Sequence, residues 1–192
     1  MTKATVVGAA LLVLAGPLQG QAQTAPSPLT VSGSFGYVRN VSHFEEPIPG
    51  INQNGMAGSL RIMWNHGHLL SAGLEAGLTR VYAVQQQLAD GSTLDATLDA
   101  VPILVVFSMS PWRRVHVNVG TGFAFSKSAI SSMGSDASSS SFGTTFMGSA
   151  GYFVPLSGRF EVGGELKFLR LAKYDDNNLS LNLALAYKFS RK

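Results

Sequence analysis

Cysteine is absent from the 192-residue sequence, and charged residues make up only 13% of it. The lack of cysteine excludes a disulfide framework, a thiolate metal site and an acylated cysteine that anchors a lipoprotein. In soluble domains roughly a quarter of all residues are charged, so a charged fraction of 13% is low. After the first two dozen residues there is also no run of about 20 apolar residues, which a membrane-spanning helix needs. Hydrophobic residues nevertheless make up 45% of the chain, and this combination favours strands.

The first residues have the features of a secretory signal peptide. Lys3 supplies a positive charge, residues 4–15 form an apolar stretch too short to span a membrane, and Gly20-Gln21-Ala22 matches a small-x-small cleavage site. We therefore expect a cleaved signal peptide over residues 1–22, a short linker over residues 23–28 and one domain over residues 29–192.

The segment from Leu179 to Phe189 has one apolar side and one polar or small side. Leucine occupies every second position from Leu179 to Leu185, and Tyr187 and Phe189 continue the same side. Side chains of a strand alternate between its two faces. This pattern fits a strand that packs on a soluble core, and it equally fits a strand with lipid outside and a polar lumen inside.

Earlier segments show the same alternation and are separated by connections that are alternately long and short. The predicted strands are Leu29–Arg39, Gly55–Trp64, Leu69–Val84, Thr93–Phe107, Arg114–Phe125, Phe142–Val154 and Phe160–Leu171. Serine-rich Ser126–Ser141 reads as the longest loop. Short periplasmic turns and longer extracellular loops are typical of bacterial outer-membrane barrels. The sequence predicts an all-β, eight-stranded antiparallel up-and-down transmembrane β-barrel.

The aromatic residues predict two girdles on the outer face of this barrel. Such girdles mark the two interfaces of the membrane. The expected short-turn girdle contains Trp64, Tyr152, Phe160, Tyr187 and Phe189, and the expected long-loop girdle contains Tyr37, Tyr82, Phe125, Phe142 and Phe168. Phe107 and Phe153 are expected to point inward, and with Met63, Ile103 and Val105 they would form an apolar plug near the short turns. On the predicted fourth strand, Leu98, Ala100, Leu104 and Val106 are expected to face lipid.

Charged residues of both signs fall on the predicted inner face. They are Arg61, Glu75, Asp95, Asp99, Glu161, Glu165, Lys167 and Lys188. Buried charges are tolerated only when they are paired, and the expected pairs include Arg61 with Glu75 and Glu161 with Lys188. The sequence predicts a structural salt-bridge network in the lumen. The alternative is a gate in which these pairs exchange and open a narrow ion path.

Several of these features together resemble a known family. They are the signal peptide, Val101-Pro102-Ile103-Leu104, the glycine-rich Val119-Gly120-Thr121-Gly122-Phe123 segment, and the alternation that ends in Tyr187-Lys188-Phe189. On these residues the chain resembles the outer-membrane protein beta-barrel domain family, the OmpA/OmpX-like eight-stranded barrels. The resemblance implies a location in the cell outer membrane, contact with its lipid and lipopolysaccharide, and insertion by the outer-membrane assembly machinery. We expect a monomer.

The sequence indicates the function less clearly than it indicates the fold. A non-enzymatic structural or surface-interaction role would use the loops Asn40–Asn54 and Ser126–Ser141, since binding residues concentrate on loops carried by a rigid scaffold. The alternatives are a narrow ion or small-solute channel, a lipocalin-like ligand-binding barrel, and a lipid A-modifying enzyme using Ser42, His43 and Glu45 or Glu46. Catalysis of that kind needs nucleophile, base and orienting group within hydrogen-bond reach, which such close neighbours rarely achieve.

Cofactors, metals and nucleic acid are not expected. His66 and His68 are too few to form a zinc site. The net charge is +3, but the basic residues are scattered rather than arranged in a stripe, which argues against nucleic-acid binding.

Overall fold

The protein is described by a computed structural model that covers residues 29–42, 51–65, 70–87, 93–132, 135–156, 158–173 and 175–189. All regular structure in these residues is β-strand. The strands are β1 (Leu29–Asn40), β2 (Ile51–Asn52), β3 (Asn54–Trp64), β4 (Leu70–Gln87), β5 (Thr93–Trp112), β6 (Val115–Ser132), β7 (Ser135–Pro155), β8 (Phe160–Leu171) and β9 (Asp176–Phe189). The predicted bounds of the seventh strand are the same as those of β8.

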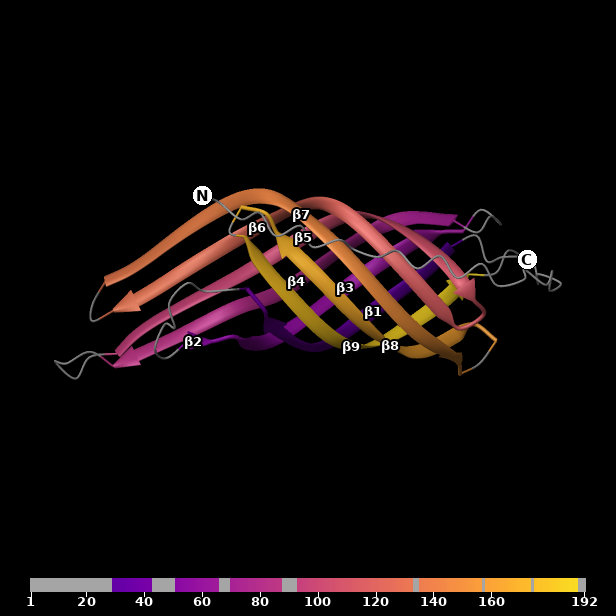
Figure 1. The fold of residues 1–192 in the computed structure, drawn as a ribbon, viewed down its shortest axis with the longest axis horizontal. Coiled ribbons are helices and arrows are strands. Elements are labelled where there is room, and N and C mark those ends of the chain that lie inside the picture. The colour runs from indigo at the N-terminus through magenta and orange to yellow at the C-terminus, as the bar shows by residue number, and fades with distance from the viewer. Residues whose placement is uncertain are drawn as a thin grey trace, which may run out of the picture.

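The long strands form a closed antiparallel barrel (Figure 1). Their order around the barrel is β4-β3-β1-β9-β8-β7-β6-β5, and β5 pairs again with β4. First and last strands meet along their full length, from Leu29 opposite Phe189 to Asn40 opposite Asn178. The two-residue β2 pairs with β4, with Ile51 opposite Val84 and Asn52 opposite Ala83. The predicted fold class, an eight-stranded up-and-down barrel, is confirmed.

The outer face of the barrel is apolar, and the inner face is mixed. On β9, for example, Leu181 and Leu183 are 65% and 69% exposed, whereas the intervening Asn182 is 4% exposed. Apolar residues turned outward from a closed barrel are what a lipid environment requires. Among the described residues, no helix is both long enough and apolar enough to cross a membrane.

The two faces of strand β5 are the reverse of those predicted. Leu98, Ala100, Leu104 and Val106 are buried in the lumen, each at most 2% exposed. The intervening Val101, Ile103, Val105 and Phe107 face outward instead. Phe107, Ile103 and Val105 therefore do not form an inner plug, although Met63 and Phe153 are buried as expected. The prediction was wrong because both faces of this strand are apolar, so the alternation does not say which face meets lipid.

The serine-rich segment is strand and not loop. Strand β6 continues to Ser132, β7 begins at Ser135, and the two remain paired over the whole segment, from Ser126 opposite Ser141 to Ser132 opposite Ser135. The loop prediction was wrong because a serine-rich, low-complexity composition indicates only that the segment forms no core. Beyond the membrane both faces of a hairpin can meet water, so strands can pair there without an apolar face.

The hairpins β4–β5 and β6–β7 are longer than the rest of the barrel. In Figure 1 their tips extend well to the left of β1, β3, β8 and β9. They are joined to each other because β5 pairs with β6 up to Asp95 opposite Ser131. The barrel thus carries a four-stranded extension on its long-loop end, which we call the β4–β7 extension.

Candidate functional site in the barrel lumen

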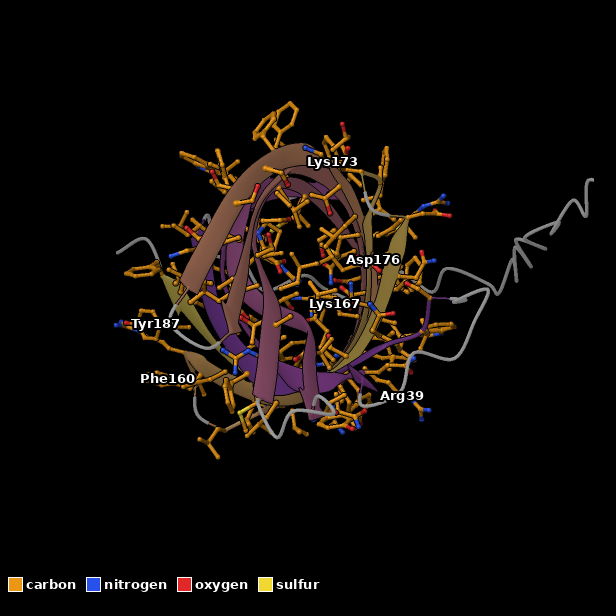
Figure 2. All side chains as sticks on the ribbon, turned by 90° about the vertical axis from the view of Figure 1, so that its left-hand side faces the viewer. Arg39, Phe160, Lys167, Lys173, Asp176 and Tyr187 are labelled. Atoms are coloured by element: carbon orange, nitrogen blue, oxygen red, sulfur yellow. The ribbon has the colours of Figure 1, made fainter. Side chains whose placement is uncertain are left out.

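Four of the predicted lumen charges come together in the middle of the barrel. Arg61 is on β3, Glu75 on β4, and Glu165 and Lys167 are two residues apart on β8, so both face inward. Four pairing steps separate β4 from β8 in either direction around the ring, so these two strands lie on opposite walls. Figure 2, which looks along the barrel, shows Lys167 inside the bore.

The four side chains form ion pairs that cross the lumen. Arg61 Nε lies 2.6 Å from Glu75 Oε2, and its Nη2 lies 2.7 Å from Glu165 Oε1. Lys167 Nζ lies 2.5 Å from Glu75 Oε1 and 3.8 Å from Glu165 Oε2. Each carboxylate thus lies between the two cations, and the charges cancel. We refer to Arg61, Glu75, Glu165 and Lys167 as the lumen network.

Neutral side chains complete the hydrogen bonding of the lumen network. Ser149 Oγ donates to Glu165 Oε1 at 2.6 Å, and Asn118 Nδ2 donates to Ser149 Oγ at 2.9 Å. On the other side, Lys167 Nζ donates to Ser59 Oγ at 2.9 Å. A buried charged group is tolerated when its remaining donors and acceptors are satisfied in this way. The alternation of the predicted strands already puts Ser59, Asn118 and Ser149 on the inner face, but nothing in the sequence marks these neutral side chains as partners of the charged ones.

The remaining predicted charges lie elsewhere. Lys188 Nζ pairs with Glu161 Oε1 at 2.6 Å, near the short-turn end and apart from the lumen network. Asp99 pairs with Arg80 at 2.9 Å on the outer face, where its side chain is 47% exposed, so its predicted place in the lumen was wrong. The inverted orientation of β5 accounts for this error. The side chain of Asp95 lies outside the described part of the chain.

Apolar and polar groups fill the lumen beside the network. Met63, Leu104, Val106 and Met147 belong to a buried cluster with residues from β3 to β8. Toward the long-loop end, a small cavity borders Glu75, Lys167, Asn178 and Asn182. The Asn178 side-chain amide is buried there and has no hydrogen-bonding partner among the described residues. Such groups are usually satisfied by ordered water, so this cavity suits water.

A second polar cluster, which the sequence did not indicate, lies where β1 and β9 emerge toward the long loops. Asn40 Nδ2 and Ser42 Oγ both donate to Asp176 Oδ1 at 3.3 Å, and the backbone N–H of Asn177 donates to Ser42 Oγ at 2.7 Å. Ser42 therefore holds the β1–β9 junction together. His43, Glu45 and Glu46 lie outside the described residues, as do His66 and His68.

The predicted girdle residues whose side chains are described lie on the outer face of the barrel. Those exposed by 39% to 62% are Trp64, Tyr152, Phe160, Phe189, Tyr37, Phe125, Phe142 and Phe168. Tyr187 also lies on the outside, packed between Phe160 and Phe189 with ring centroids 4.9 and 4.7 Å away, and Figure 2 shows it beside Phe160. The side chain of Tyr82 lies outside the described part of the chain.

Comparison with known proteins decides the family. The family model described as "Outer membrane protein beta-barrel domain" matches residues 8–189. The chain belongs to this family. As an outer membrane beta-barrel domain protein it is located in the outer membrane, in agreement with the resemblance noted in the sequence. The matched range includes part of the predicted signal peptide, but residues 1–28 lie outside the described residues, so that peptide and the linker stay predictions.

Solved outer membrane barrels share the fold of this family member. The attachment invasion locus protein Ail of Yersinia pestis is 15% identical with a TM-score of 0.52, and the alignment covers 83% of this chain and 98% of that one. Neisserial surface protein A is 12% identical with a TM-score of 0.54 and coverage of 85% and 98%. The N-terminal barrel of Pseudomonas aeruginosa OprF is 9% identical with a TM-score of 0.50 and coverage of 85% and 98%. Among curated proteins none matches.

Proposed function

We propose that this protein is a non-enzymatic, non-conducting barrel that presents the β4–β7 extension to the exterior of the cell. The observation that carries this proposal is the lumen network. Its ion pairs run between opposite walls, from Glu75 on β4 to Lys167 on β8, and apolar side chains pack beside them. A bore of this strand number is just wide enough for side chains to fill. A filled bore supports a scaffold role better than transport.

The β4–β7 extension supports the surface role. It continues strand pairing beyond the girdle residues Phe125 and Phe142, which face each other across β6 and β7. Residues from Ser126 to Ser141 therefore stand outside the membrane. Paired strands hold their backbone in place, so the extension offers a binding surface with less conformational freedom to lose than an open loop.

A polyanionic ligand is the first class to test. The attachment invasion locus protein Ail, which shares the fold, has been solved in complex with the heparin analogue sucrose octasulfate. In this chain Arg39 and Lys127 are exposed on the outer face, each two residues beyond a girdle aromatic. Cations at these positions can meet sulfate or phosphate groups of surface polysaccharides.

Removal of the hairpin tip tests the surface role. Replacing residues 127–140 with Asn-Gly should leave the barrel folded, because a two-residue turn closes β6 onto β7 and the pairing below it is unchanged. Heat-modifiable gel mobility checks folding, and binding of whole cells to immobilised heparin measures function. The Ser139→Thr variant, which keeps the hairpin, is the matched control. Full binding by the shortened barrel would contradict the proposal.

An ion channel is the second candidate, favoured by one detail of the lumen network. Lys167 Nζ lies within reach of both carboxylates, 2.5 Å from Glu75 and 3.8 Å from Glu165. A small movement could transfer Lys167 from one to the other. Planar-bilayer recordings separate the two functions: we expect no conductance from the wild type, and discrete openings that disappear in Lys167→Met would establish the channel instead.

Several narrower points belong to the same proposal. The protein would be a monomer, inserted by the outer-membrane assembly machinery and surrounded by phospholipid and lipopolysaccharide.

The hydrogen bonds of Ser42 at the β1–β9 junction support a structural rather than a nucleophilic role for this residue. Lipid A from cells that overproduce the protein should keep its acyl chains by mass spectrometry, and loss of one chain would establish an enzyme.

A further inference from the structure

The short-turn end of the barrel carries exposed arginines in two neighbouring turns. Arg113 and Arg114 lie between β5 and β6, and Arg159 lies immediately before β8. Arg114 O accepts a hydrogen bond from Phe153 N on β7, and Arg159 O accepts one from Lys188 N on β9, both at 2.8 Å. These backbone bonds fix both arginines beside the short-turn aromatic girdle.

Two of these arginines are joined to girdle tyrosines. Arg114 Nη1 donates to Tyr152 Oη at 3.1 Å, and Arg159 Nη1 donates to Tyr187 Oη at 3.4 Å. In each pair the phenol oxygen accepts, so its own O–H remains available to donate, and the guanidinium keeps further N–H donors. Each Arg–Tyr pair therefore presents several donors and a positive charge at the edge of the membrane.

These arginines differ from two exposed arginines of the long-loop end in having no acidic partner among the described residues. On the long-loop end, Arg80 pairs with Asp99 at 2.9 Å and Arg170 pairs with Asp175 at 2.7 Å. None of the ion pairs within the described residues involves Arg113, Arg114 or Arg159. The nearest acid in sequence, Glu161, pairs with Lys188 and is mostly buried, with its side chain 17% exposed. The arginines of the short-turn end therefore keep their charge for a partner outside the chain.

We propose that the pairs Arg114–Tyr152 and Arg159–Tyr187 each bind the phosphate of an anionic phospholipid in the periplasmic leaflet. Short turns face the periplasm in this class of barrel, and tyrosine in the girdle lies at the depth of the headgroups. Arginine binds phosphate oxygens through charge-assisted hydrogen bonds in a forked arrangement. The phenol O–H adds a donor directed to the same anion, while the rings of Tyr152 and Tyr187 lie against the lipid chains.

Native mass spectrometry of the refolded full chain tests this site. The protein in neutral detergent is titrated with phosphatidylglycerol, with zwitterionic phosphatidylcholine and with inorganic phosphate. We expect retained phosphatidylglycerol and little retained phosphatidylcholine, because choline places a positive charge beside the arginines. Inorganic phosphate at equal concentration should not displace the lipid. Equal retention of both lipids would overturn the proposal, and displacement by free phosphate would show an anion site without lipid preference.

Matched variants locate the binding. Arg114→Gln with Arg159→Gln should weaken phosphatidylglycerol binding about tenfold, whereas Arg80→Gln with Arg170→Gln at the other end should leave it unchanged. Tyr152→Phe with Tyr187→Phe keeps the rings and the charge, and should weaken binding about threefold through loss of the phenol donors. Heat-modifiable mobility verifies that every variant is folded. Wild-type affinity in both the glutamine and the phenylalanine variants would exclude these pairs as the site.

Discussion

At the residue scale, the lumen network depends on the balance of its charges. Glu75 lies between Arg61 and Lys167, both of which are mostly buried. Substituting one partner of a buried ion pair leaves the other charge without compensation, and removal of a partner typically costs several kcal/mol. Interactions on the outer surface near the membrane edge are worth much less.

The variant Glu75→Gln should therefore destabilise the barrel strongly. We expect the free energy of unfolding, measured by guanidinium titration of the barrel refolded in bilayers, to fall by about 3 kcal/mol. The matched control Asp99→Asn removes an exposed partner of Arg80 and should cost less than about 1 kcal/mol. Similar costs for the two variants would show that the lumen network contributes little to stability.

Asp176 offers a test of pH dependence at the mouth of the barrel. It lies outside the membrane-spanning part, three residues beyond Leu179, which pairs with the girdle residue Phe168. Burial raises the pKa of Asp176, and Asp175 adds to this, although hydrogen bonds from Asn40 and Ser42 oppose it. A carboxyl group with a raised pKa in the folded state favours folding at low pH, and this contribution is lost as pH rises through the folded-state pKa.

Asp176→Asn should accordingly change how stability varies with pH. The variant keeps an oxygen acceptor for Asn40 and Ser42 but does not ionise. The unfolding free energy of the wild type relative to Asp176→Asn should be highest at about pH 3 and should fall as the pH approaches about 6. A constant difference over this range would mean that Asp176 titrates with an ordinary pKa.

At the scale of the strand, the curvature of a small barrel brings neighbouring backbones close together. A Cβ placed on Gly163 of β8 would lie 2.2 Å from Tyr152 O and 2.9 Å from Phe153 Cα on β7. The adjacent Gly164 has nothing within 4 Å of its Cβ position. Glycine at a sharply bent strand position often marks such a close approach of backbone.

The two glycines form a natural pair of variants. Gly163→Ala should lower the unfolding free energy by about 2 kcal/mol or prevent folding, since β7 must move to accommodate the methyl group. Gly164→Ala should be neutral or slightly stabilising, because alanine loses less conformational freedom than glycine on folding. Refolding yield and guanidinium unfolding measure both, and equal behaviour would contradict the close packing of β7 and β8.

The strands also show what could be predicted from the sequence. β9 alternates leucine with polar or small residues, and β8 alternates in the same way from Glu165 to Phe168, so their faces follow directly from the pattern. β5 could not be oriented in this way, because Leu104 on one face is as apolar as Ile103 on the other. The acidic Asp99 favoured assigning its face to the lumen, because the sequence does not show that Arg80 forms an ion pair with it on the outer face.

The lumen network was predictable only in part. Arg61 and Glu75 flank one short turn, so their pairing follows from strand order. The bonds from β8 to β3 and β4 cross the barrel between residues about a hundred positions apart in sequence, such as Lys167 and Glu75. No local pattern contains that information, because it depends on the closure and the size of the ring.

At the scale of the whole molecule, both tryptophans mark the same membrane interface. The chain contains two tryptophans, Trp64 at the end of β3 and Trp112 at the end of β5, and they are 62% and 63% exposed. Both strands end at short turns. Aromatic residues at such positions lie near the headgroups rather than in the middle of the bilayer.

Quenching of tryptophan fluorescence should therefore place both tryptophans at one depth in the bilayer, near the headgroups. In vesicles of lipids brominated near the headgroup, we expect stronger quenching of tryptophan than with bromines near the chain ends. The boiled, unfolded protein is the control and should lose the dependence on depth. Stronger quenching by deep bromines would place Trp64 and Trp112 inside the hydrocarbon and contradict the proposed position of the barrel in the membrane.

The pairing of β1 with β9 determines when the barrel can close. The first strand has its permanent neighbour at the opposite end of the chain, from Leu29 with Phe189 to Asn40 with Asn178. Until β9 has been synthesised, the free edge of β1 has no strand to pair with. The cell must therefore export and protect the polypeptide from β1 through β9 before insertion can finish, and a chain without β9 would be an open, adhesive sheet.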